Sequence, residues 1–183
     1  MSDGKLISFE GIEGVGKSTT INSIREYLEA RGIEVYCTRE PGGTKFGESL
    51  RDILLNKKSV ITSEAELLII FSIRNQHISE IIKPKLSQGT WVLCDRYIDA
   101  SIAYQGFGKG VDLKKIKSLI ELFTYNVMPD LTVFFDLKYE IAKKRFPKNK
   151  NKDRFEILDS EFFNKVYDGL VNHLEGMAIK NEW

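Results

Sequence analysis

The sequence predicts an α/β protein built on a doubly wound parallel sheet with helices on both faces. Apolar runs of strand length alternate along the chain with segments whose apolar residues recur at helical spacing. In addition, each distinctive polar motif directly follows one of the predicted strands. Such alternation is typical of a parallel sheet, whose ligands bind at the carboxyl ends of the strands. We therefore expect one sheet with the functional residues along one of its edges.

Four runs have the length and composition of buried strands. They are residues 6–10, 34–38, 91–95 and 131–136. The first is rich in β-branched and aromatic residues, as buried strands are. Cys37 and Cys94 each lie near the end of a predicted strand, where a buried thiol is expected rather than a disulfide or a metal pair.

Three segments between these strands have helical periodicity. Residues 18–30 end before Gly32, a residue type that commonly follows a helix end. In residues 63–86, a long segment, apolar side chains recur on alternating faces of the predicted helix. In residues 113–123 they recur at helical spacing. The long segment carries a stripe that is more typical of a core than of a contact with a partner. The stripe consists of Ile69, Phe71, Ile73 and Ile78.

Composition limits the possible partners. With 183 residues, 42% of them hydrophobic, the chain can form one domain, residues 1–183, with its own core. A net charge of +1 gives no electrostatic reason to expect nucleic acid or an acidic membrane surface. The longest uncharged apolar stretch, residues 67–73, is too short to span a bilayer, and Glu10 precedes any secretory apolar region. We expect a cytoplasmic protein that acts on small molecules, with no nucleic acid and no membrane as partner.

A phosphate-binding loop follows the first strand. Residues 11–18 read GIEGVGKS, which fits the spacing GxxxxGKS between a strand and a helix. The glycines let backbone amides turn toward phosphate oxygens, Lys17 reaches the β and γ phosphates, and the Ser18 hydroxyl can ligate magnesium. An ordinary glycine-rich turn is the alternative, which the flanking strand and helix disfavour. The loop predicts a protein that binds a nucleoside triphosphate.

Further cations follow the other strands. Residues 39–44 read REPGGT, a turn that places the Arg39 guanidinium at the carboxyl edge of the sheet, unless Arg39 is a plain surface charge. After the third strand, Asp95 can hold magnesium or its waters and Arg96 a second phosphate, although the two could also form a structural pair. Arg51 and Arg74 lie in helical segments. Each alone fits a surface charge, but together these arginines suggest a second anionic group.

These motifs, in this order, resemble the bacterial type of the thymidylate kinases. The resemblance rests on the phosphate loop, TREPGGT at residues 38–44, DRY at 95–97 with SIAYQG at 101–106, PDL at 129–131 and DRFE at 153–156. It covers about residues 5–174. The combination of the TREPGGT turn with the DRY segment is highly specific, whereas the phosphate loop alone occurs in many enzymes.

The resemblance implies transfer of the ATP γ-phosphoryl group to dTMP, giving dTDP, with Mg²⁺ and in a homodimer. ATP would bind at Gly11, Ile12, Glu13, Gly14, Val15, Gly16, Lys17, Ser18, Thr19, Arg145 and Arg154. The catalytic cations would be Lys17, Arg39, Arg96 and Arg154, and the metal ligands Ser18 and Asp95. In-line phosphoryl transfer rests on positioning and charge neutralisation, so no dedicated general base is required.

The resemblance also assigns residues to dTMP. Glu13 would accept a hydrogen bond from the 3′-hydroxyl, and Tyr104 would crowd the 2′ position and exclude ribonucleotides. The arginines around the phosphate would be Arg39, Arg51 and Arg96, and the residues at the base Arg74, on thymine O4, with Ser101 and Gln105. The family stacks a Phe on thymine four residues before the arginine equivalent to Arg74. Here that position is Ile70 and the aromatic residue is Phe71, so we expect either a small helix shift or an aliphatic contact.

A basic segment at about residues 145–156 resembles the mobile lid of the family, which closes over ATP. Bacterial-type lids supply an arginine that the phosphate loop lacks, and Glu13 is followed here by Gly14 rather than Arg. Arg154 and Arg145 are therefore the expected phosphate contacts. The centre of the segment departs from the pattern, because it carries Lys148, Lys150 and Lys152. Lysine acts as a point charge without the bidentate fork of arginine.

Three alternatives remain. A regulatory GTP-binding switch would need an NKxD segment, and the nearest approach, at residues 164–168, has its acid one place too late. A kinase of another nucleoside monophosphate is disfavoured by Tyr104 with Ser101 and Gln105. The third is an inactive nucleotide-binding protein, since we expect the last strand and helix of the family to be missing after Trp183. The sequence leaves open whether that is a natural loss or a truncation.

Overall fold

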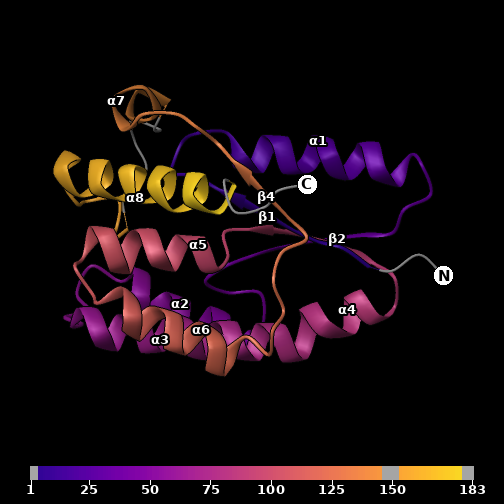
Figure 1. The fold of residues 1–183 in the computed structure, drawn as a ribbon, viewed down its shortest axis with the longest axis horizontal. Helices are drawn as coiled ribbons and strands as arrows, with labels where there is room; N and C mark the ends of the chain where they lie inside the picture. Colours follow the sequence, from indigo (N-terminus) through magenta and orange to yellow (C-terminus); the bar gives the residue numbers. More distant parts are fainter. Residues whose placement is uncertain (1–3, 146–152, 179–183) are drawn as a thin grey trace.

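The chain forms a parallel sheet with helices on both faces, as the alternating pattern predicts (Figure 1). The computed structural model describes residues 4–145 and 153–178. Its strands lie in the order β2-β3-β1-β4. They are β1 (Leu6–Glu10), β2 (Val35–Arg39), β3 (Trp91–Asp95) and β4 (Leu131–Phe134). The second strand begins and ends one residue later than predicted, and the fourth ends before Phe135.

Helices cover the two faces of the sheet. On one face, α1 (Lys17–Glu29) packs Ile21 and Leu28 against apolar side chains of β1 and β3. The other face is covered by three helices and a π-helical segment (Figure 1). They are α3 (Ser63–His77), η1 (Ile78–Ile82), α4 (Lys83–Ser87) and α6 (Leu113–Phe123). The helix predicted over residues 63–86 is therefore continuous, with a π-helical stretch inside it.

Several helical elements have no predicted bounds, although Arg51, which lies in the first of them, was placed in a helical segment. They are α2 (Lys45–Leu55), α5 (Ile98–Ser101), η2 (Ile102–Gly108), α7 (Tyr139–Ala142), η3 (Lys143–Arg145) and α8 (Ser160–Ala178). The α2 helix begins after Thr44, whose hydroxyl accepts a 2.9 Å hydrogen bond from the amide of Gly47. The α8 helix packs on η2 and forms, with α7, a separate apolar cluster beside the phosphate loop (Figure 1).

The stripe on α3 belongs mainly to the core. Phe71, Ile73 and Ile78 are fully buried within the chain, and Ile69 is half-buried. Both cysteines carry free thiols; Cys94 is buried, as expected, whereas Cys37 is only half-buried. Over the part of the chain that the structure describes, no helix is both long and apolar enough to cross a membrane.

Because all strands are parallel, their carboxyl ends share one edge. Glu10, Arg39 and Asp95 end β1, β2 and β3 at this edge, and Arg39 and Phe9 both pair in register with Asp95. The loops after these strands therefore converge. These loops carry the motifs singled out in the sequence.

Candidate active site

A cavity of about 430 Å³ lies at the carboxyl edge of the sheet, between the phosphate loop, α2, α3 and η2. Most of the residues predicted for the two nucleotide sites line it. These are Glu13, Gly14, Val15, Gly16, Lys17, Ser18, Thr19, Arg39, Arg51, Ile70, Arg74, Asp95, Arg96, Ser101, Tyr104 and Gln105. Segments that are far apart in the sequence thus line the same cavity.

The phosphate loop holds its lysine inward. The ammonium of Lys17, the first residue of α1, donates hydrogen bonds to the carbonyl oxygens of Gly11 and Ile12, both at 3.0 Å. Burial lowers the pKa of Lys17 to about 8, and the positive charge of Arg96 acts in the same direction. The loop bends at Gly16, whose φ of 102° favours glycine, although a Cβ there would meet no atom within 4 Å. Glycine is needed at this position for the backbone, not for space.

Asp95 offers an oxygen that has no hydrogen bond. Its Oδ1 is buried and lies 3.9 Å from the ammonium of Lys17, and no described residue donates a hydrogen bond to it. Ser18 lies on the same cavity with an exposed side chain at the start of α1. A carboxylate oxygen and a hydroxyl are hard oxygen donors of the kind that Mg²⁺ binds.

Arg96 connects the phosphate loop to η2. Its Nη1 donates a 2.7 Å hydrogen bond to the carbonyl oxygen of Gly11, and its Nη2 lies 3.6 Å from a carboxylate oxygen of Glu13. The guanidinium stands 5.0 Å from the ring centroid of Tyr104. The backbone at Arg96 has a φ of 69°, which is uncommon for a residue with a side chain. This strained turn aims the guanidinium back over the loop that precedes α1.

Two more guanidinium groups reach the cavity from the turn after β2 and from α2. Arg39 is 53% exposed and donates a 2.8 Å hydrogen bond to Glu48, and Arg51 donates to the carbonyl oxygen of Pro41 at 2.5 Å. Burial lowers the pKa of Arg51, and the neighbouring Arg39 charge adds to this effect. With Arg96, these side chains bring three positive charges to one region of the cavity.

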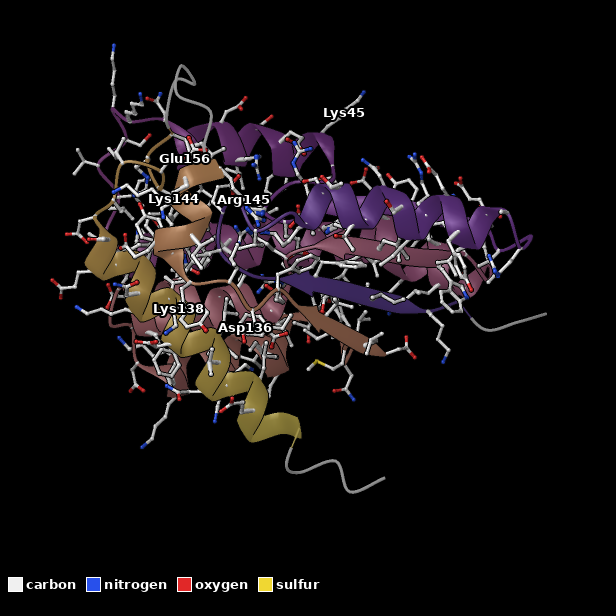
Figure 2. The ribbon with its side chains drawn as sticks, turned by 90° about the horizontal axis from the view of Figure 1, so that it is seen from above. Lys45, Asp136, Lys138, Lys144, Arg145 and Glu156 are labelled. Atoms are coloured by element: carbon white, nitrogen blue, oxygen red, sulfur yellow. The ribbon has the colours of Figure 1, made fainter. Side chains whose placement is uncertain are left out.

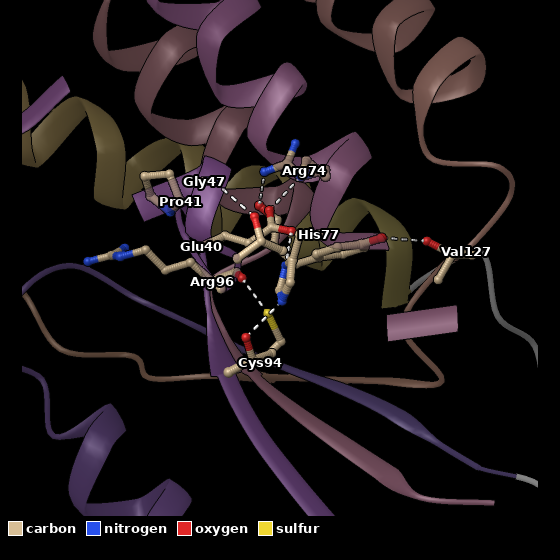
Figure 3. Close-up of polar contacts among 12 residues, drawn as sticks. Glu40, Pro41, Gly47, Arg74, His77, Cys94, Arg96 and Val127 are labelled. Atoms are coloured by element: carbon tan, nitrogen blue, oxygen red, sulfur yellow. Dashed lines mark hydrogen bonds and ion pairs between the residues drawn. The ribbon is translucent and has the colours of Figure 1, made fainter. Parts of the chain in front are cut away.

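Arg74 is a buried arginine with one unused donor group (Figure 3). Its Nε donates to Glu40 at 2.6 Å, and its Nη2 donates to the carbonyl oxygen of Tyr97 at 2.9 Å and to the hydroxyl of Ser101 at 3.0 Å. Its Nη1 is buried without a hydrogen-bond partner among the described residues. Because a buried unpaired N–H group is costly, this donor indicates a place for a ligand acceptor.

Gln105 and the end of the predicted lid meet on a buried carboxylate that the sequence prediction does not contain. Glu66, on α3, accepts a hydrogen bond from Nε2 of Gln105 at 2.9 Å and from Nζ of Lys109 at 2.6 Å. Its other donor is Nη2 of Arg154. Arg154 also donates from Nε to the carbonyl oxygen of Leu54 at 2.7 Å, at the end of α2. Arg154 therefore bridges α2 and α3.

Comparison with known proteins agrees with this geometry. A family model described as thymidylate kinase matches residues 9–180. The chain belongs to the thymidylate kinase family. It is 47% identical to the thymidylate kinase of Psychrobacter sp. (strain PRwf-1), covering 92% of this chain and 83% of that protein. It is 43% identical to that of Methylobacillus flagellatus, covering 94% and 84%. Among solved structures, thymidylate kinase from Ehrlichia chaffeensis matches with a TM-score of 0.79 and 37% identity, covering 95% of this chain and 82% of that one.

Not every residue that the thymidylate kinase resemblance assigns lies on the cavity. The structure places Gly11, Ile12, Phe71, Arg145 and Arg154 outside its lining. Gly11 takes part through its carbonyl oxygen, which accepts from Lys17 and Arg96. Ile70 lines the cavity, whereas the ring of Phe71 lies 4.8 Å from the Arg74 guanidinium carbon and packs in the core. Of the two expectations for this position, the geometry therefore favours an aliphatic contact.

The predicted lid is only partly described. Lys148, Lys150 and Lys152 lie outside the described residues. Arg145 ends η3 and is exposed, and Figure 2 shows it toward the same end of the molecule as Glu156, which lines the cavity. Contact of Arg145 or Arg154 with a phosphate stays a prediction, because the hydrogen bonds of Arg154 go to α2 and α3.

Other residues of the cavity were not predicted from the sequence. They are Glu40, Pro41, Leu55, Tyr97, Ala100, Asp153, Phe155, Glu156 and Phe163. Glu40 stands inside the REPGGT motif, where an acid next to an arginine could have signalled a buried pair. Leu55 lies on α2 and Phe163 on α8. Both are apolar residues outside any polar motif, so the sequence gives no reason to single them out.

Proposed function

We propose that the 430 Å³ cavity is the dTMP site and that the phosphate loop at its rim holds the ATP phosphates. The reaction is transfer of the γ-phosphoryl group of ATP to dTMP, which gives dTDP for dTTP synthesis. The family assignment and the arrangement of charges around the cavity support it. None of the observations favours a GTP-binding switch or an inactive relative.

The unused donor of Arg74 is the observation that carries the base assignment. A guanidinium whose other N–H groups are held by Glu40, Tyr97 and Ser101 presents Nη1 in a fixed direction. Thymine offers a carbonyl acceptor at O4, whereas cytosine carries an amino donor there. A site built to donate at this point rejects the wrong base, because a donor would be left unpaired. Gln105 and Ile70 would complete the contact with the base.

The sugar and phosphate of dTMP would lie between the base and the phosphate loop. Arg39, Arg51 and Arg96 would neutralise the acceptor phosphate, and bidentate guanidinium groups suit this task. Glu13 would accept from the 3′-hydroxyl. Tyr104 would fill the space beside the 2′ carbon. Each of these side chains lines the cavity.

Catalysis would come from positioning and electrostatics. Lys17, on the phosphate loop, shares the carbonyl oxygen of Gly11 with Arg96 and would hold the β and γ phosphates of ATP. Arg96 would face both nucleotides, since it lies against Gly11 and Glu13 of the loop. Holding donor and acceptor phosphates in line, with the charge between them neutralised, accounts for phosphoryl transfer without a general base.

The residues present also fit a magnesium ion. Ser18 and Asp95 would hold it, because the Oδ1 atom of Asp95 is buried and takes no hydrogen bond from the described residues. Residues 4–145 and 153–178 contain no group of three or more acidic, histidine or cysteine side chains that could hold a metal ion by themselves. This agrees with Mg²⁺ in kinases, which takes one or two protein ligands and completes its shell with phosphate oxygens and water. When bound, the ion would neutralise charge on the phosphate oxygens.

A homodimer in the cytoplasm is the proposed state of the enzyme. Phe46 and Ile53 on α2 and Leu68 on α3 are about half exposed, and the two helices pack together. Apolar side chains gathered on neighbouring helices suit an interface between two copies. Light scattering of the purified chain would test this state.

A substrate panel tests the proposed function. ADP release would be measured by a coupled assay with ATP, Mg²⁺ and each of dTMP, dUMP, dCMP and dGMP. We expect the highest kcat/KM with dTMP. Equal turnover of dCMP would contradict the base assignment, and binding of dTMP without ADP release would favour an inactive relative.

A further inference from the structure

Behind Arg74 lies a chain of buried polar side chains that reaches back to the sheet (Figure 3). Glu40 accepts from Nε of Arg74 through Oε2, and its Oε1 lies 3.0 Å from Nδ1 of His77. The other ring nitrogen of His77, Nε2, lies 2.7 Å from the hydroxyl of Thr38 on β2. His77 is fully buried, and Arg74 and Glu40 nearly so. Three hydrogen bonds thus run from Thr38 to the guanidinium that faces the cavity.

The charge on Glu40 decides which nitrogen of His77 carries a proton. Burial by itself would raise the pKa of Glu40, but the Arg74 charge and the His77 hydrogen bond outweigh it and hold that pKa below its ordinary value. An ionised Glu40 can only accept, so Nδ1 of His77 carries the proton and donates it. Nε2 lies 2.7 Å from the hydroxyl of Thr38, which can donate to it or accept from it. Each of the three hydrogen bonds therefore joins a donor to an acceptor.

The backbone around His77 leaves space for this ring. A Cβ at Gly43 would lie 2.5 Å from Nε2 of His77 and 2.9 Å from the hydroxyl oxygen of Thr38. Gly43 also has a φ of 83°, a conformation that favours glycine. The second glycine of the REPGGT turn therefore lets the chain pass directly over the hydrogen bond between Thr38 and His77.

His77 and Arg74 are three residues apart on α3, so both face the same carboxylate. Without the His77 donor, Oε1 of Glu40 would be buried and unpaired, and the carboxylate would turn to find another partner. Among the described residues, Glu40 is the acceptor for Nε of Arg74, so the guanidinium would then pivot about its two remaining hydrogen bonds, from Nη2 to Tyr97 and Ser101. The unused Nη1 group would then point in a different direction.

We propose that His77 is a positioning residue for base selection: held by Thr38, it fixes Glu40 so that Arg74 presents Nη1 to a pyrimidine with a carbonyl group at position 4. This inference rests on the proposed function, since it requires Arg74 to contact the base. His77 itself touches no substrate. Its effect is on the choice between dTMP and dCMP, not on the use of ATP.

The test measures the ratio of kcat/KM for dTMP to that for dCMP, with KM for ATP and Tm recorded for each variant. In His77→Leu, which removes both ring nitrogens, we expect the ratio to fall by roughly tenfold or more, as expected for one hydrogen bond lost at the base. His77→Asn keeps an amide donor close to the Nδ1 position, so its ratio should stay within about threefold of wild type. KM for ATP should not change in either variant.

His173→Leu is the matched control. His173, on α8, is the other histidine of the chain, and its Nε2 lies 3.0 Å from the buried carboxylate of Asp99. Removing it also takes the ring partner from one oxygen of a buried carboxylate, but this carboxylate does not lie behind Arg74. Its ratio should therefore match wild type even if Tm falls. If His77→Leu cannot be obtained folded, His77→Phe, which keeps a ring but removes both nitrogens, replaces it, and that variant must lower the ratio as well.

The outcomes separate this inference from the proposed function. If wild-type enzyme does not prefer dTMP over dCMP, the base assignment fails and the inference fails with it. If wild type prefers dTMP and Arg74→Lys loses the preference, but His77→Leu keeps it, the function stands and the role of His77 is overturned. An equal loss in His77→Leu and His173→Leu would also overturn it, because it would reflect general destabilisation.

Discussion

The guanidinium of Arg154 pairs with the buried carboxylate of Glu66, which also accepts a hydrogen bond from Lys109. The last arginine of the basic segment is thus attached to α3, the helix that carries Arg74. We predict that Arg154→Ala lowers kcat more than it raises KM for dTMP, because a phosphate contact made during transfer acts on turnover. Steady-state kinetics at varied dTMP would measure both constants.

Lys109→Ala is the control for this prediction. It removes another cation from the same Glu66 oxygen without touching the basic segment. A fall of kcat in Arg154→Ala alone would support a phosphate contact. Equal effects in the two variants would mean that Arg154 acts only as a structural partner of Glu66, and unchanged kcat in Arg154→Ala would remove the lid assignment.

Ile70→Ala tests the aliphatic contact with the base. Ile70 is nearly buried and lines the cavity, whereas its neighbour Phe71 packs in the core. Deleting three carbons from a pocket wall should raise KM for dTMP by roughly tenfold, with a smaller effect on kcat. KM for ATP serves as the internal control. An unchanged KM for dTMP would show that the base does not reach this wall.

Asp95→Asn tests the magnesium site. The change keeps the shape of the side chain but removes the charge next to Lys17. We expect the Mg²⁺ concentration for half-maximal activity to rise by about tenfold, since the remaining amide oxygen is a weaker ligand for a hard cation. A titration of activity with Mg²⁺ at fixed ATP measures this shift. Identical titration curves for wild type and variant would exclude Asp95 from the metal site.

Much of this site could be predicted because the polar motifs follow strands. The loop with Lys17 and the segment with Asp95 and Arg96 were located from short spacings, and a parallel sheet brings strand ends to one edge. The partners of these residues could not be found in this way. Glu66 and His77 lie inside an apolar helix pattern, and the side-chain hydrogen bonds they make are with residues at least 37 positions away in the sequence. Spacing along the chain carries no signal for such pairs.

The helices that were not predicted in full also depend on contacts between segments that are distant in the sequence. The helical segment around Arg51 was predicted without bounds, because α2 follows a motif that reads as a turn, and α8 packs over η2 on the cavity side rather than on the sheet. The π-helical segments η1 and η2 shift the helical periodicity from within. The central strand was predicted best, because β1 is buried along its whole length and such a strand reads as an apolar run in the sequence.

Glu10 gives a prediction for the dependence of stability on pH. Burial and, to a smaller extent, the nearby Asp99 charge raise its pKa to about 8, so folded Glu10 keeps its proton where the unfolded chain has lost it. Its contribution to stability is therefore greatest below the ordinary value of 4.5 and is lost as pH rises toward about 8. Glu10→Gln keeps an acceptor for the amide of Tyr97 and does not titrate.

We therefore expect Glu10→Gln to flatten the fall in Tm between pH 5 and pH 8 and to be more stable than wild type at pH 8 by a few degrees, as scanning calorimetry would measure. The two proteins should have similar Tm at pH 4.5, where both side chains are neutral. A parallel fall in Tm for both proteins would show that Glu10 is not the titrating group.

The most direct test of the account is to measure the products of the reaction itself. Purified enzyme with ATP, Mg²⁺ and dTMP would be sampled over time, and dTDP and ADP quantified by chromatography, with Lys17→Met as the control for the phosphate loop. The account predicts dTDP and ADP in equal amounts from the wild type and a rate at least about a hundredfold lower from the variant. ADP formed without dTDP, or equal rates from the two proteins, would contradict it.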